Sequence, residues 1–248
     1  MGHSLPTYRV RAVNIAPDSE NKIHDDAVAA QYGFRGGLVV GVTVYGYMAQ
    51  PVIAYAPEWL QHGSMSFRLF EPFYDGDQVV VKAVVHDDGS IAVAAERDDG
   101  SLAGKAVAIV NPDPAEPPVA IPEVPLPSRD DRPAATRETV LPGALLGTIE
   151  ATLETTEPAA LLQLSNQMLV QNFRLGPWIH AASDLRNWSS PMPGERISAR
   201  GRICERFDRK GHEFLSADVM LVGEGGRLIQ SVRHTAIYKI RAAGAHAS

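Results

Sequence analysis

The first half of the chain contains an apolar run, LVVGVTVYGYMAQPVIAY (38–55), that indicates the fold more strongly than any other stretch. Its apolar residues are spread around all sides of the helix that it predicts, and such a helix is buried on most faces. The run is interrupted at Gly41, Gly46, Gln50 and Pro51, which favours a core helix over a membrane span. A single helix becomes buried in this way when a sheet wraps around it.

Antiparallel strands are predicted after this helix. Turn-forming pairs punctuate the rest of the first half, at Asp75-Gly76, Asp88-Gly89 and Asp99-Gly100. An extended segment over 8–13 and a short helix over 25–32 precede the long helix. One long helix with several antiparallel strands is an α+β organisation, and a sheet wrapped around a central helix is the hot-dog arrangement.

The second half repeats this plan. An extended segment over 145–149 precedes a predicted helix over 159–173, and turn signals follow at Pro193-Gly194, Lys210-Gly211 and Gly225-Gly226. At a constant offset of 118, the residues His62, Arg68, Gly76 and Val79 map onto His180, Arg186, Gly194 and Ile197. The shared order of elements and the constant offset predict duplication of one unit, and therefore a double hot-dog of two fused halves.

A proline-rich stretch separates the halves, with eight prolines between 111 and 133. Such chain forms neither helix nor central strand and tends to an extended geometry. We therefore predict a first half over 1–110, a surface linker over 111–138 and a second half over 139–248.

The composition indicates a globular protein and argues against several kinds of partner. The 248 residues are 45% hydrophobic, carry a net charge of −6 and contain no run of Lys or Arg, so no nucleic-acid partner is expected. Residues 1–7 lack the apolar segment of a signal peptide, and Cys204 is the lone cysteine, so a reducing, cytoplasmic location is expected. No metal-ligand spacing or phosphate-binding loop is found, so neither a metal nor a cofactor is expected.

Residues suited to chemistry gather just before the long helix, in DSENKIHDD (18–26) and GFRGGLVVG (33–41). His24 is a natural acid or base near neutral pH. The backbone N–H of Gly41 is a candidate donor to a substrate oxygen, because a helix N-terminus favours negative charge and glycine permits close approach. Asp25 and Asp26 are also suited to capping the short helix that follows.

Together these motifs resemble the signature of the MaoC-type (R)-specific enoyl-CoA hydratases and dehydratases. That family's pattern reads Asp-x-Asn-Pro-apolar-His-x-Asp, followed by Gly-Phe, a glycine-containing turn and a His-Gly pair that opens the hot-dog helix. The matching positions are Asn21, Ile23, His24, Asp26, Gly33, Phe34 and Gly41. The sequence departs at Ser19, Lys22 and Val40, where the family has aspartate, proline and histidine. The later FRLFEPFYDGD (67–77) also resembles a strand segment of the family.

The resemblance implies reversible hydration of a trans-2-enoyl-CoA to a 3-hydroxyacyl-CoA. His24 and Asn21 would be catalytic, and Ser19 stands at the position of the catalytic aspartate. Because serine cannot replace a carboxylate as a base, three alternatives stay open. Asp18 or Glu20 supplies the carboxylate, or His24 acts alone and is held by Asn21, or the chemistry has changed or been lost.

Four residues are candidates for substrate binding. Gly41 and Val40 stand at the start of the long helix, and Arg35 is a candidate for contact with a phosphate or the thioester. Trp178 would line an acyl tunnel between the halves or, alternatively, seal the core. His180 is weighed as a second catalytic group against an ordinary structural role.

The second half carries TTEP (155–158) and no histidine where the motif would fall, so we predict that this half is catalytically degenerate. Two other functions remain open for the whole chain. A hot-dog thioesterase would hydrolyse the thioester, and a non-catalytic subunit would bind acyl-CoA or a partner protein without turnover. In the catalytic readings the CoA thioester is a small-molecule substrate. The sequence also leaves a homodimer open.

Overall fold

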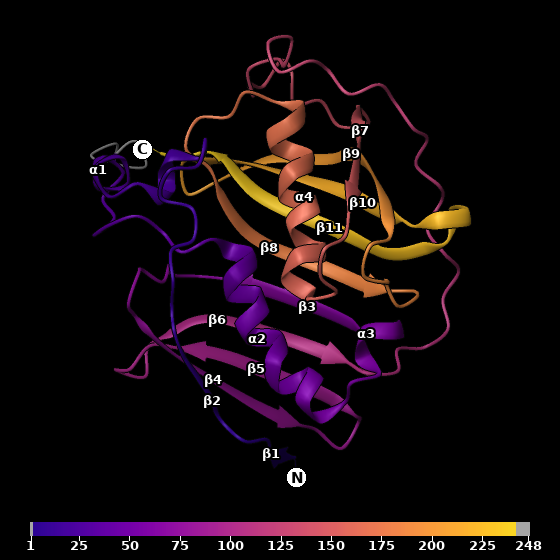
Figure 1. Ribbon diagram of the computed structural model, residues 1–248. Coiled ribbons are helices and arrows are strands. Elements are labelled where there is room, and N and C mark those ends of the chain that lie inside the picture. The colour runs from indigo at the N-terminus through magenta and orange to yellow at the C-terminus, as the bar shows by residue number, and fades with distance from the viewer. Residues whose placement is uncertain (1, 242–248) are drawn as a thin grey trace.

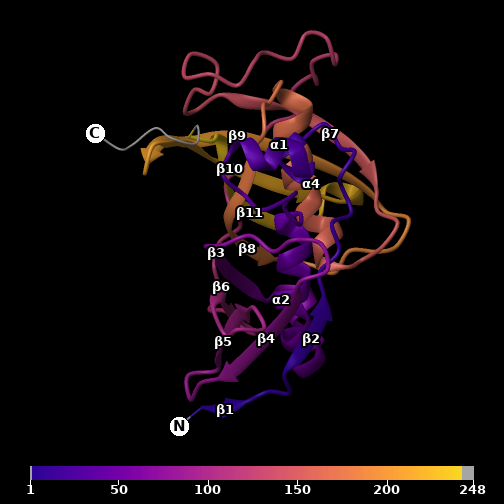
Figure 2. The same cartoon turned by 90° about the vertical axis from the view of Figure 1, so that its left-hand side faces the viewer.

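Two long helices, α2 (Gly41–Tyr55) and α4 (Pro158–Asn172), lie on the same face of one antiparallel sheet in the computed structural model, which describes residues 2–241 (Figure 1). The sheet curves around the helices, and its outer strands lie on the helix side (Figure 2). α2 buries Tyr45, Met48 and Val52 in the core between itself and the sheet. This is the environment expected for a helix that is apolar on all sides.

The two halves contribute similar sets of strands. The first half provides β1 (His3–Ser4), β2 (Tyr8–Arg11), β3 (Ser64–Leu69), β4 (Gln78–Val85), β5 (Ser90–Glu96) and β6 (Leu102–Ile109). The second half provides β7 (Leu145–Thr152), β8 (Ile179–Asn187), β9 (Arg196–Arg209), β10 (His212–Val222) and β11 (Leu228–Lys239). The short helices are η1 (Lys22–His24), α1 (Asp26–Gln31), α3 (Trp59–His62) and η2 (Glu224–Gly226).

The strand order shows the duplication directly. Neighbouring strands follow the order β1-β4-β5-β6-β3-β8-β11-β10-β9-β7, and β2 also pairs with β4. Read outward from the central β3–β8 pair, each half has the same sequence of strands, and each has one long helix on the inner face. The predicted α+β, double hot-dog fold is therefore confirmed.

The central strand pair obeys the offset of 118 that the sequence predicts. Ser66 pairs with Asp184 in the antiparallel register of β3 and β8, and these two residues are equivalent by the offset. Ser64 pairs with Arg186, and Arg68 pairs with Ala182, as a local two-fold axis through this point requires. The Ser66 hydroxyl donates to the Asp184 carboxylate, and Arg68 pairs with the same carboxylate at 2.9 Å.

The predicted turns also lie where expected between strands. Gly76 and Gly194 are equivalent by the offset and adopt φ values of +81° and +80°, a region that favours glycine. The helix boundary is less well predicted, because α2 begins at Gly41 rather than at Leu38. The preceding residues are extended instead, since the Val39 N–H donates to the Phe73 carbonyl at 2.8 Å.

Between β6 and β7 the chain runs from residue 110 to residue 144 without a helix or strand. It lies along the outside of the sheet, and Ile121 is buried there against Met220 and Val222 (Figure 1). None of the described helices is long and apolar enough to cross a membrane.

Candidate active site

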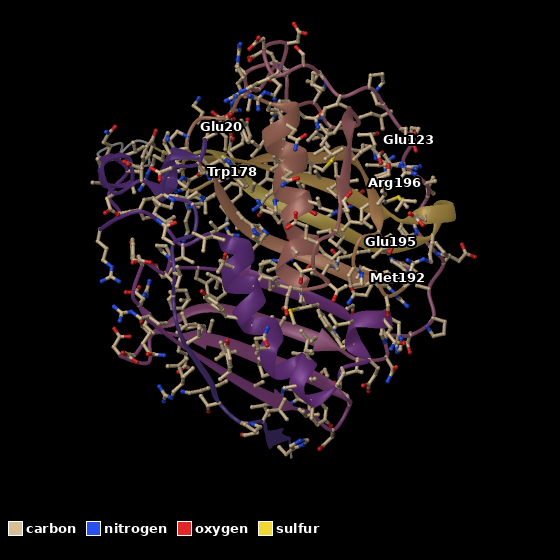
Figure 3. The ribbon with its side chains drawn as sticks, viewed as in Figure 1. Glu20, Glu123, Trp178, Met192, Glu195 and Arg196 are labelled. Carbon is tan, nitrogen blue, oxygen red and sulfur yellow. The ribbon has the colours of Figure 1, made fainter. Side chains whose placement is uncertain are left out.

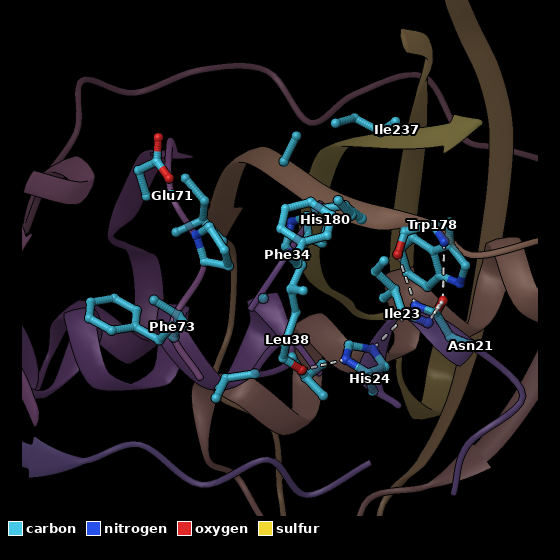
Figure 4. Close-up of a pocket in the computed structure, with 18 of the residues that line it drawn as sticks. Asn21, Ile23, His24, Phe34, Leu38, Glu71, Phe73, Trp178, His180 and Ile237 are labelled. Atoms are coloured by element: carbon cyan, nitrogen blue, oxygen red, sulfur yellow. Dashed lines mark hydrogen bonds between the residues drawn. The ribbon is translucent and has the colours of Figure 1, made fainter. Parts of the chain in front are cut away.

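A cavity of about 280 Å³ lies where the two halves meet (Figure 4). It is enclosed by η1, the first turn of α2, the segment after β3, the middle of α4 and the start of β8. Most of the lining is apolar. The polar lining residues are Asn21, His24, Glu71, Asn166, His180 and His212.

His24 lies in η1 and presents one ring nitrogen to this cavity. Its Nδ1 is 2.7 Å from the carbonyl oxygen of Leu38. A carbonyl only accepts, so Nδ1 carries the proton and Nε2 is a hydrogen-bond acceptor. Burial lowers the pKa of His24, and the hydrogen bond to the Leu38 carbonyl offsets part of that effect. His24 is therefore a neutral imidazole with a basic Nε2 at neutral pH.

Asn21 joins this histidine to the other half of the molecule. Its Oδ1 accepts from the backbone N–H of Trp178 at 3.1 Å, and its Nδ2 donates to the Trp178 carbonyl at 3.0 Å. The same Nδ2 lies 3.2 Å from His24 Nε2 (Figure 4). Asn21 also caps η1 by accepting from the Ile23 N–H. One side chain thus sets the position of His24 and of the residue at the start of β8.

The two aspartates of the motif hold the loop that carries the histidine. Asp25 is the N-cap of α1 and accepts from the Val28 N–H at 2.9 Å, and Asp26 accepts from the Gly37 N–H at 2.7 Å. The second bond draws the glycine-containing turn back towards η1. Neither carboxylate lines the cavity.

Gly41 and Val40 both line the cavity at the start of α2. Gly41 is the first helical residue, and its N–H has no acceptor within the helix. A side chain at this position would collide with the second half, because a Cβ on Gly41 would lie 2.9 Å from His180 Cβ and 3.1 Å from His180 Nδ1. Glycine is therefore required by close packing against β8.

The carboxylates proposed to substitute for the missing aspartate do not line this cavity. Asp18 is exposed, and Glu20 forms ion pairs with Arg129 and Arg132 outside it. Ser19 turns back on its own loop and donates to the Asn21 carbonyl at 3.2 Å. Arg35 is also outside the cavity, where it pairs with Asp77 and stacks on Tyr74, and its side chain is 62% exposed.

Among the other residues that line the cavity, four bear on the site, and only one of them, Trp178, is predicted from the sequence to bind substrate. Trp178, which was predicted, lines the cavity and is buried. Asn166 from α4 and Glu71 from the segment after β3 also line it. No motif marks Asn166, and Glu71 belongs to the family-like stretch 67–77 without being a predicted site residue. His180, whose functional role was left open, lies against Gly41. Its only signal in the sequence was its place in the repeat.

The equivalent helix start in the second half lacks the donor group. α4 begins at Pro158, and proline has no backbone N–H. Glu157 stands at the N-cap where the first half has Val40. A substrate oxygen would therefore find a first-turn N–H at the first position of α2 but not at that of α4.

A cationic cluster lies on the outer side of the same site. A second cavity of about 360 Å³ shares Asn21 and Trp178 with the first. Its charged lining, among the described residues, consists of Lys22, Arg129, Arg132 and Arg174 together with Glu20. Figure 3 shows Glu20 and Trp178 close together beside α4. The linker supplies two of the arginines, so it adds positive charge at one end of the site.

Comparison with solved structures supports the fold. A protein described as a MaoC domain dehydratase from Chloroflexus aurantiacus is 11% identical, with a TM-score of 0.65 over 98% of this chain and 96% of that one. An acyl-CoA thioesterase II from Mycobacterium marinum is 14% identical, with a TM-score of 0.61 over 96% and 94% of the two chains. A conserved Mycobacterium tuberculosis protein with a double hot-dog fold is also 14% identical, with a TM-score of 0.61 over 94% and 96%. No protein-family model and no curated protein matches the sequence.

Proposed function

We propose that the protein is an acyl-thioester hydratase or dehydratase, which adds water reversibly to a trans-2-enoyl-CoA to form a 3-hydroxyacyl-CoA. The observation that carries this proposal is the pairing of two groups in one apolar cavity. His24 offers a neutral, basic Nε2, and Gly41 offers a free N–H at a helix N-terminus. A base for water and a donor for the thioester oxygen are the two groups that this reaction needs.

In the proposed reaction, the thioester carbonyl accepts from the Gly41 N–H, and a water molecule donates to His24 Nε2, where it takes the place of the Asn21 Nδ2 donor that contacts this nitrogen in the structure. The water oxygen bonds to the β-carbon while Nε2 takes one water proton. The electron pair of the C=C bond moves towards the carbonyl oxygen, which becomes an enolate held by the helix start. The enolate then collapses, and the proton on Nε2 is delivered to the α-carbon. The net change is addition of H and OH across the double bond.

This scheme assigns both proton transfers to His24. The positions of Ser19, Asp18 and Glu20 outside the cavity favour the alternative in which the histidine acts alone and is held by Asn21. A neutral histidine suits both steps, because it accepts a proton from water and returns it within one turnover. The apolar walls around it exclude other water molecules from the enolate.

The cationic cluster supports CoA as the carrier of the acyl group. CoA carries phosphates at the end remote from the thioester, and arginine recognises phosphate well. Arg174 and Lys22 line the outer cavity beside Trp178, next to the thioester site. With its phosphates bound in the outer cavity, the rest of the CoA molecule would extend past Asn21, and the thioester at its far end would reach Gly41.

The direct test is hydration of a panel of trans-2-enoyl-CoA substrates, followed by the loss of absorbance of the conjugated thioester. The wild type should turn over, and His24→Ala should lose about 10²–10⁴-fold in kcat. His62→Ala is the matched control, because His62 bonds to Asn111 away from the cavity and should retain turnover. Full turnover in His24→Ala would refute the assignment of the base.

Thioester hydrolysis is the second candidate, and the comparisons favour keeping it, since a thioesterase is among the structures of similar fold. The same two groups would serve it, with water attacking the carbonyl carbon and the thiol of CoA as the leaving group. A thiol reagent separates the two reactions. Release of free CoA without loss of the double bond would move the assignment to hydrolysis.

A further inference from the structure

Behind Gly41, three buried polar side chains form a line through β8 and β11. His180 Nε2 lies 2.9 Å from Ser183 Oγ, and Ser183 Oγ lies 3.2 Å from His234 Nδ1. His180 is 4% exposed, and the other two residues are fully buried. The two imidazole rings are 4.2 Å apart between centroids. Such a polar line in a hydrophobic core costs desolvation free energy and calls for an explanation.

The cavity end of this line has a polar atom without a partner. His180 Nδ1 makes no hydrogen bond to any described residue, although the ring lines the cavity. It lies against Gly41, so an oxygen bound to the Gly41 N–H would be next to this nitrogen. His234 Nε2, at the other end of the line, also has no partner, but His234 lines no cavity, so of the two unpartnered nitrogens only His180 Nδ1 belongs to a residue that a bound molecule could reach.

The line can be polarised so that this nitrogen is a donor. Burial lowers the pKa of His180 to about 3, against a smaller opposing effect of the Ala182 carbonyl, and lowers that of His234 well below its ordinary value. Both rings are therefore neutral. If His234 Nδ1–H donates to Ser183 and Ser183 donates to His180 Nε2, the proton of His180 is on Nδ1. Each direction leaves one buried ring N–H without a protein acceptor, at His180 Nδ1 in the first and at His234 Nε2 in the reverse. Only His180 lines the cavity, so only the first direction lets a bound molecule supply the missing acceptor.

We propose that His180 is a second hydrogen-bond donor to the substrate. Its Nδ1–H and the Gly41 N–H both donate to the thioester carbonyl oxygen. Ser183 and His234 are positioning residues that hold the ring and its tautomer. This inference rests on the proposed action on acyl thioesters. It also assigns a role to the second half, which places a histidine at the helix start of the first half. A neutral imidazole stabilises an oxyanion without giving up its proton.

A pair of substitutions separates this role from a structural one. The amide nitrogen of asparagine overlays histidine Nδ1, and that of glutamine overlays Nε2. His180→Asn should keep the donor to the substrate and stay within about tenfold of wild-type kcat. His180→Gln should keep the contact with Ser183 but lose about 10²–10³-fold in kcat with little change in KM. If His180 had only a structural role, His180→Gln would retain more activity than His180→Asn, because it keeps the contact with Ser183. A higher kcat in His180→Gln than in His180→Asn would therefore overturn the proposal.

A second readout does not depend on turnover. The absorbance of 4-dimethylaminocinnamoyl-CoA moves to longer wavelength when its carbonyl is polarised, and this conjugated thioester serves as the probe. We expect the shift in wild type and in His180→Asn, and its reduction in His180→Gln. A shifted probe with no hydration of any enoyl-CoA would refute the hydratase proposal and still support the donor. An equal shift in both variants, or no shift in wild type, would overturn the donor.

Discussion

Gly41 and Pro158 are the first helical residues of α2 and α4, the long helices of the two halves. They differ in hydrogen bonding, because glycine has a backbone N–H there and proline has none. The helix start of the first half can therefore donate a hydrogen bond that the helix start of the second half cannot. A histidine of the motif also precedes only the first of the two helices.

Gly41→Ala tests the closeness of the two halves at this point. The new Cβ would lie 2.9 Å from His180 Cβ, so the free energy of unfolding should fall by about 1–3 kcal/mol and turnover should fall with it. Gly46→Ala is the matched control in the same helix. Its Cβ would meet Ala159 Cβ at 3.1 Å, and stability should stay within about 1 kcal/mol of wild type. Thermal unfolding measures the stability of the two variants, and kcat measures their turnover. Equal effects of the two substitutions would argue against close packing of Gly41 on β8.

Ser19→Ala addresses the departure from the family pattern. Ser19 bonds to its own loop and does not line the cavity, so kcat/KM for enoyl-CoA should stay within about threefold of wild type. Asp18→Asn should behave in the same way. A loss of a hundredfold in either variant would mean that the loop rearranges to bring that residue to the substrate.

The rate should depend on pH through His24. Burial lowers its pKa below the ordinary value of 6.5, and only the neutral form accepts a proton from water. The kcat/KM for hydration should therefore be level near neutral pH and fall on the acid side, with an apparent pKa below 6.5. A profile that rises with an apparent pKa well above 6.5 would point to a different base.

Stability should also fall with acid, because buried neutral histidines resist protonation. In the unfolded chain His180 takes a proton below pH 6.5, whereas in the folded chain it does so only at about pH 3. The unfolded state therefore binds more protons in this window, and stability present above pH 6.5 is lost as the pH falls. Chemical denaturation at several pH values between 6.5 and 5 gives the slope of the free energy of unfolding against pH. This slope should be shallower in His180→Asn than in wild type, by up to about 1.4 kcal/mol per pH unit. Equal slopes would mean that the ring is protonated in the folded state.

Arg174→Ala tests the cationic cluster as a phosphate site. The KM for enoyl-CoA should rise about tenfold with little change in kcat, because a charge-assisted hydrogen bond is lost in both ground and transition states. An N-acetylcysteamine thioester carries no phosphate, so its kinetics should not change. Arg35→Ala is the control, because Arg35 pairs with Asp77 outside both cavities. Equal effects on both thioesters would exclude phosphate recognition.

Much of the fold could be predicted because its signals are local. The apolar run before Tyr55 and the glycine turns depend on neighbouring residues, and the offset of 118 reappears in the Ser66–Asp184 pair. The start of α2 could not be placed, because Val39 is extended through a bond to Phe73, which is distant in sequence. A helix start that is fixed by a tertiary contact cannot be read from the helix propensities of the neighbouring residues.

The candidate site could be predicted only where its residues are close together in the sequence. His24, Asn21 and Gly41 belong to one continuous stretch, and all three line the cavity. The contact between Asn21 and Trp178 spans 157 residues, so no spacing reveals it. His180 and Asn166 come from the second half, where the motif is absent, and only the folded chain brings them to the helix start.

The single covalent chain has a consequence for how such a site can evolve. In a pair of identical units every mutation occurs twice, so a proline at one helix start would remove the donor from both. Here each half has its own codons, and Pro158 leaves Gly41 untouched. One half can then change at its own helix start without altering the other, and it can still contribute a residue to the neighbouring helix start, as His180 does by lying against Gly41.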